Sequence, residues 1–171
     1  MVEDGYMLTH EIYEKLIESL CANDGIVEAL QSKTEMVDKN LSLSLTIYQA
    51  LISCLCRMGR CSEAESLMQE MTESGLKPSF KICRDLVKGY CEQQNIQKAE
   101  SLLISFAMEH QLYDLECYNA LMKAFCQRGD VTRSIELQDK LLKLGFVPNS
   151  LTCKHVLDGL LIAVRKNKND A

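Results

Sequence analysis

The feature of this chain that most restricts its fold is a repeat of 35 residues without insertions. One series of matching residues is Tyr13, Tyr48, Cys83, Tyr118 and Cys153. Two further series are Leu16, Leu51, Leu86, Leu121 and Val156, and Cys21, Cys56, Cys91 and Cys126. A segment of this length is too short to bury its apolar residues alone, so the period predicts repeats that stack on one another in a solenoid.

Each repeat has the pattern of two helices joined by a turn. The first repeat places apolar residues at three- and four-residue spacing, on one helix face: Ile12, Leu16, Ile17 and Leu20. We expect this helix near residues 10–22 and a second one near 26–40. The pattern predicts a single array with full repeats over 10–44 (repeat 1), 45–79 (repeat 2), 80–114 (repeat 3) and 115–149 (repeat 4).

Both ends of the chain hold partial repeats. Residues 1–9 match residues 71–79 at twice the period, so we expect them to be the end of a preceding repeat and the chain to be a piece of a longer protein. Residues 150–171 predict a partial repeat or capping helix, ending near 166, with a frayed polar tail from Arg165 to Asp170. Repeat 3 lacks the two glycines and the proline that mark the turns of repeats 2 and 4, and its corresponding positions hold Gln94, His110 and Tyr113. We expect its turns to be the least sharply fixed.

Composition and motifs exclude several classes of protein. No apolar stretch approaches the roughly 18 residues of a membrane span, and the net charge of −5 disfavours binding nucleic acid by bulk charge. Nine cysteines without a secretory signal indicate reduced thiols. The cysteines do not have the spacing of a metal site. Cys54 and Cys56 lie on opposite sides of a helix, and cysteines of successive repeats lie too far apart to bind the same metal ion. Without a phosphate loop, nucleophile elbow or metalloprotease motif, the chain predicts no catalytic residue, metal, cofactor or small-molecule substrate.

The residue pattern of repeat 2 closely resembles the pentatricopeptide repeat. The matching residues are Tyr48, Leu51, Ile52, Leu55, Cys56, Gly59, Glu63, Ala64, Glu70, Met71, Gly75 and Pro78. The resemblance implies an all-α fold, a right-handed α-α superhelical solenoid of helix-turn-helix repeats. It also implies single-stranded RNA as the partner, bound along the first helices of the repeats. Such proteins act in the mitochondrion or chloroplast of plants, in the processing, stability or translation of RNA.

The resemblance assigns candidate RNA-binding residues in each repeat. The base-reading pairs are Glu14 with Ser44, Gln49 with Ser79, Arg84 with Asp114, and Asn119 with Asn149. The pair in repeat 4 resembles the combination that reads pyrimidines, and the other three fall outside well-understood combinations. Candidate residues that sandwich a base or contact phosphate are Thr46, Lys81, Leu151, Arg57 and Lys88.

The charges on the first helices leave a second function open. Repeat 1 carries Glu11, Glu14 and Glu18, which would repel phosphate, whereas repeat 3 carries Lys81, Arg84 and Lys88, which would attract it. The alternative to RNA binding is a module for protein interaction or self-association, because helical arrays present long surfaces to partner helices. An enzyme is the third and least favoured hypothesis.

Overall fold

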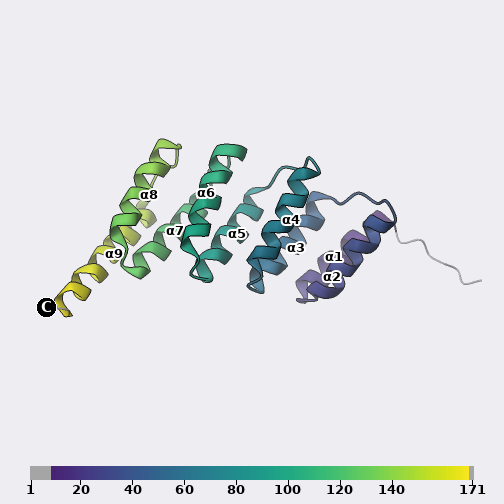
Figure 1. The fold of residues 1–171 in the computed structure, drawn as a ribbon, viewed down its shortest axis with the longest axis horizontal. Helices are drawn as coiled ribbons and strands as arrows, with labels where there is room; N and C mark the ends of the chain where they lie inside the picture. The colour runs from purple at the N-terminus through teal and green to yellow at the C-terminus, as the bar shows by residue number, and fades with distance from the viewer. Residues whose placement is uncertain (1–8, 170–171) are drawn as a thin grey trace, which may run out of the picture. The chain divides into compact units, whose positions relative to one another are not determined.

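The computed structural model describes residues 9–169, and within them the chain forms nine α-helices (Figure 1). The predicted end of a preceding repeat, residues 1–9, falls almost entirely outside these residues. The helices are α1 (His10–Ala22), α2 (Ile26–Asp38), α3 (Leu45–Arg57), α4 (Cys61–Glu73), α5 (Phe80–Glu92), α6 (Ile96–His110), α7 (Leu115–Arg128), α8 (Val131–Lys143) and α9 (Ser150–Asn169). The helices expected near 10–22 and 26–40 are confirmed as α1 and α2.

The turn between the two helices of a repeat uses a left-handed residue, and this residue recurs with the period of the sequence. The residues with positive φ are Asp24, Gly59, Gln94 and Gly129, at 60°, 72°, 61° and 76°. Gln94 therefore adopts the conformation that glycine adopts in repeats 2 and 4. His110 does not replace the glycine that ends the second helix, because α6 continues through His110 and the left-handed residue is Gln111.

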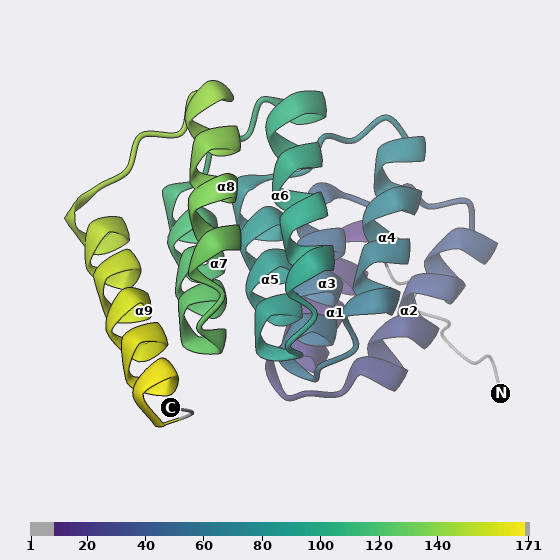
Figure 2. The ribbon, with the colours of Figure 1, turned by 60° about the vertical axis from the view of Figure 1, so that its left-hand side comes forward.

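The chain divides into two compact units, residues 1–76 and 77–171. In the first unit α1 packs against α2 and α3, and α3 packs against α4. In the second unit α7 lies between α5 and α9, while α6 and α8 cover the other side of these helices (Figure 2). The second unit thus presents α5, α7 and α9 as one layer of neighbouring helices.

The repeating apolar residues form the core, with exceptions on α1 and at Cys153 of α9, which is exposed. Leu51, Leu86 and Leu121 are fully buried, and the cysteine series Cys21, Cys56, Cys91 and Cys126 is buried as well. The exception on α1 is its predicted apolar face, on which Ile12 is 47% and Leu16 is 39% exposed. Among the described residues α1 packs mainly on α2 and α3, so these two side chains have no helix covering them.

The last helix is longer than expected. Its 20 residues extend to Asn169, past the end that we expected near residue 166, and the fraying of the tail from Arg165 stays a prediction. Arginine and lysine favour helix, and this stretch contains neither glycine nor proline to end it. Within residues 9–169, no helix has both the length and the apolar composition that crossing a membrane requires.

Thiol labelling provides a direct check of this packing. Eight cysteines are buried and Cys153 is exposed, and burial raises the pKa of Cys21 and Cys91 to about 12. Because the thiolate is the reactive form, we expect a disulfide reagent at about pH 8 to modify one thiol quickly in the native protein. All nine should react in denaturant. Cys153→Ser should abolish the fast reaction, and fast labelling of a second thiol would contradict the packing.

Candidate nucleic-acid interface

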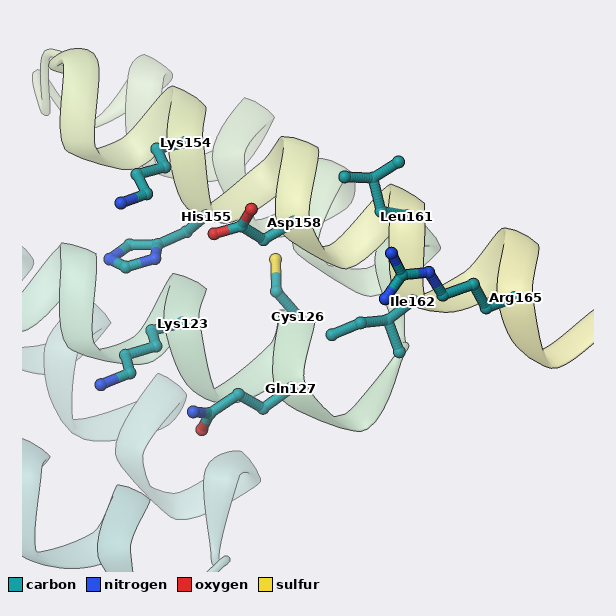
Figure 3. Close-up of a pocket in the computed structure, with 9 residues that line it drawn as sticks. All are labelled: Lys123, Cys126, Gln127, Lys154, His155, Asp158, Leu161, Ile162 and Arg165. Carbon is teal, nitrogen blue, oxygen red and sulfur yellow. The ribbon is translucent and has the colours of Figure 1, made fainter.

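The second unit carries a basic pocket between α7 and α9 (Figure 3). Its volume is about 510 Å³, and it is lined by Lys123, Cys126, Gln127, Lys154, His155, Asp158, Leu161, Ile162 and Arg165. The side chains of Lys123, Lys154 and His155 extend toward the same side of the two helices. The pocket therefore gathers several cationic groups around one acidic residue, Asp158.

The positive charges of this pocket outnumber its one acidic residue, Asp158. Lys123, Lys154 and Arg165 form no ion pair with any described residue. Burial and the nearby charge of Lys123 lower the pKa of His155 below its ordinary value. Such an arrangement favours a bound anion, since uncompensated cations attract negative charge.

A second pocket adjoins the first along the same layer of helices. It lies between α5 and α7, has a volume of about 380 Å³, and shares Lys123 and Gln127 with the first pocket. Lys88 of α5 also lines it, and the two pockets together follow the face formed by α5, α7 and α9. We name this surface the α5-α7-α9 face.

The predicted pair Asn119 and Asn149 is brought together through a third residue. Thr152, on the first turn of α9, donates from its hydroxyl to Asn119 Oδ1 over 2.6 Å. Asn149 precedes α9, and its Oδ1 accepts the backbone N–H of Thr152 at 3.0 Å. Asn119 is only 8% exposed, while Asn149 is exposed. The pair lies on the same layer of helices as the basic pocket.

The predicted pair Arg84 and Asp114 forms a direct salt bridge. Arg84 Nε donates to Asp114 Oδ2 over 2.8 Å, and Asp114 also accepts the backbone N–H of Cys117 at 3.0 Å. Burial opposes ionisation of Asp114, but these hydrogen bonds outweigh it and hold its pKa below the ordinary value. Glu116 lies 3.4 Å from Arg84 and 3.2 Å from Lys88. The cations expected to make repeat 3 attract phosphate are thus largely paired, apart from the exposed Lys81.

The first unit places its candidate residues in similar internal contacts. Ser44 donates to Glu14 Oε1 over 2.7 Å, and this hydrogen bond lowers the pKa of Glu14. Thr46 is exposed and contributes a smaller part of the same shift. Arg57 contacts Asp24 at 2.7 Å and the backbone oxygen of Cys21 at 2.5 Å. A phosphate contact by Arg57 would have to compete with this carboxylate.

Three candidates remain: Leu151, Gln49 and Ser79. Leu151 is 47% exposed on α9. Gln49 belongs to the first unit and Ser79 to the second, so this pair stays a prediction. Among the described residues, no cluster of three or more His, Cys, Asp or Glu side chains is arranged to hold a metal ion.

The prediction from sequence missed most of the basic pocket. Lys123 lies one period after Lys88, and following that spacing would have identified it. Lys154 occupies the base-reading position of the last partial repeat, and the position of its partner lies beyond the given sequence. His155 and Arg165 lie outside the positions that the resemblance assigns, and only the approach of α9 to α7 brings them into the pocket.

Comparison with known proteins identifies both the repeat and the fold. The family model for the PPR repeat matches residues 46–76 and 116–146. No curated protein matches the chain in sequence. Among solved structures, the pentatricopeptide repeat protein PPR10 from maize is 18% identical and superimposes with a TM-score of 0.84, over 96% of this chain and 24% of PPR10.

Structures of RNA complexes are also similar to this chain. PPR10 in complex with an 18-nt psaJ RNA element has 18% identity and a TM-score of 0.71, over 92% of this chain and 23% of PPR10. The PPR domain of Arabidopsis thaliana protein-only RNase P 1 in complex with tRNA has 14% identity and a TM-score of 0.71, over 92% of this chain and 83% of that domain. These matches confirm the predicted fold class, an all-α solenoid of helical repeats. The chain spans about a quarter of the length of PPR10.

Proposed function

Because this chain is built from pentatricopeptide repeats, we propose that it binds single-stranded RNA through the α5-α7-α9 face of its second unit. The observation that carries this proposal is the group of unpaired cations that line the pocket, Lys123, Lys154 and Arg165, on the two helices whose first turns hold Asn119 and Thr152. Phosphate attracts such cations, and an amide can hydrogen-bond to the edge of an unstacked base. The RNA complexes of the similar structures support the same class of ligand.

The proposal extends to the role of the protein in the cell. We propose that it acts by binding RNA rather than by catalysis, as part of a factor for processing, stability or translation of transcripts in a mitochondrion or chloroplast. This role derives from the repeat family. The chain spans about a quarter of the length of PPR10, so this cellular role is a proposal for the protein as a whole.

Charge reversal on the α5-α7-α9 face tests the proposal. We expect the protein to bind labelled pyrimidine-rich single-stranded RNA in a saturable and salt-sensitive manner, and more tightly than DNA of the same sequence. Lys123→Glu should weaken binding about tenfold for every RNA sequence. It should also reduce the slope of the logarithm of the binding constant against the logarithm of the salt concentration by about one. Binding isotherms at several salt concentrations measure both effects.

The matched control is Lys143→Glu, which changes the net charge equally on α8, outside the face. Its affinity for RNA should equal that of the wild type. An equal loss in both variants would mean that net charge, and not the pocket, determines binding. A wild-type protein that binds no RNA at tens of micromolar would overturn the proposal.

A second candidate function, protein interaction or self-association, is favoured by apolar residues on α9. Leu157, Leu160 and Leu161 are exposed, although the corresponding residues one repeat earlier are buried: Met122, Phe125 and Cys126. Exposed apolar clusters often mark contacts with other proteins. This function would replace RNA binding if the wild-type protein bound no RNA but associated with itself as its concentration increased. The Leu157→Glu variant should then lose this self-association.

A further inference from the structure

Glu116, on the first turn of α7, holds two cations of α5 with one carboxylate. Its Oε1 lies 3.4 Å from Arg84 Nη1, and its Oε2 accepts a hydrogen bond from Lys88 Nζ at 3.2 Å. Each oxygen of the carboxylate therefore faces one cation. A phosphate group of RNA also presents two charged oxygens and binds the same types of cation, so it matches this position in charge and in geometry.

The two carboxylates beside Arg84 differ in their access to solvent. The side chain of Asp114 is 5% exposed, and it also accepts the backbone N–H of Cys117 at 3.0 Å. The side chain of Glu116 is 58% exposed, and those of Arg84 and Lys88 are exposed as well. Because exposed ion pairs contribute little to stability, another anion can replace Glu116 at small cost, whereas Asp114 stays in place.

The neighbouring helix pair shows this surface without the carboxylate. One period after Lys88 is Lys123, and one period after Glu116 is Leu151. Lys88 and Lys123 both line the second pocket. Within the described residues Lys123 has no ion pair, whereas Lys88 is paired with Glu116. The same lysine position therefore occurs twice on the α5-α7-α9 face, once paired and once unpaired.

We propose that the Glu116 carboxylate competes with RNA phosphate for Arg84 and Lys88, and that it thereby limits the affinity of the α5-α7-α9 face for RNA. A strand bound at Lys123 places its next phosphates near Lys88, since the two lysines line one pocket. There the carboxylate repels the phosphates and occupies the cations that would bind them. The inference rests on the proposed RNA binding of this face.

Replacing Glu116 with glutamine tests the competition, because glutamine has nearly the same shape and no charge. We expect Glu116→Gln to bind pyrimidine-rich single-stranded RNA about fivefold more tightly than the wild type, the effect of about one exposed ion pair. The logarithm of the binding constant should also fall more steeply with the logarithm of the salt concentration, by about one, as for one additional phosphate contact. Binding isotherms at several salt concentrations measure both changes.

The matched control is Glu136→Gln on the exposed side of α8. It changes the net charge equally, and its affinity for RNA should equal that of the wild type. Circular dichroism checks that both variants are folded, as expected for changes at exposed side chains.

A double-mutant cycle separates competition for Lys88 from a general effect of charge on the face. Lys88→Gln alone should weaken RNA binding less than about twofold, because Glu116 already occupies this lysine. In that background Glu116→Gln should raise the affinity about twofold or less, since only Arg84 is then released. The same fivefold gain in both backgrounds would mean that Glu116 acts by its charge alone, and would overturn the competition.

The other outcomes separate this inference from the proposed function. RNA binding by the wild type, with no greater affinity in Glu116→Gln than in Glu136→Gln, would overturn the role of Glu116 and leave the proposed function standing. If neither the wild type nor Glu116→Gln binds RNA, the proposed function itself is refuted, and the competition with it.

Discussion

Replacing Gly159 with alanine should destabilise the second unit by about 2 kcal/mol, because α9 approaches α7 too closely for an added methyl group. A Cβ atom at this position would lie 2.8 Å from both Cβ and Sγ of Cys126 and 3.1 Å from its Cα. These atoms belong to the helix backbone or lie next to it, so the helices must separate. Urea unfolding followed by circular dichroism would measure the loss.

A double-mutant cycle with Cys126→Gly isolates this contact. The single change at Cys126 costs stability through its lost thiol packing and through the helix propensity of glycine. In that background Gly159→Ala should cost much less than in the wild type, since two of its three close neighbours are gone. Costs that add without coupling would contradict the close approach of α7 and α9.

The sequence predicts helices better than it predicts contacts between them. The period of 35 places the helix pairs and the buried cysteines because both follow from one repeated pattern. It also contains a series of small residues that ends at Gly159: Ser19, Cys54, Gly89, Ala124 and Gly159. That series indicates a tight helix contact, although the pattern alone does not say which helices approach.

In the candidate site, too, the sequence places the residues but does not predict which of them contact each other. The repeat assigns Arg84 and Asp114 to one base-reading pair, but only the structure shows them bonded to each other at 2.8 Å. The spacing in the sequence fixes where a side chain starts, while its partner depends on neighbouring side chains from another helix. For this reason the Thr152 hydrogen bond and the pocket between α7 and α9 could not be read from the chain.

Replacing Tyr48 with phenylalanine should cost about 1.5 kcal/mol, whereas the same change at Tyr118 should be neutral or stabilising. Tyr48 Oη donates to Glu70 Oε1 over 3.0 Å, and Glu70 is held by Lys33 at 2.6 Å. Tyr118 is one of the same series, but its Oη is buried without a partner. The residue two periods after Glu70 is Lys140, which pairs instead with Glu100 at 3.4 Å.

The two tyrosines can be compared by urea unfolding of the two variants, with the dependence on pH as a second readout. Burial raises the pKa of Tyr118 to about 12, above the value of about 10 for a tyrosine in an unfolded chain. The folded state therefore resists ionisation, and the stability that depends on neutral Tyr118 is complete below pH 10 and falls as the pH rises toward 12. Tyr118→Phe lacks this loss, so its advantage over the wild type should widen above about pH 10. A cost at Tyr118 as large as that at Tyr48 would mean that its hydroxyl has a hydrogen-bond partner in solution.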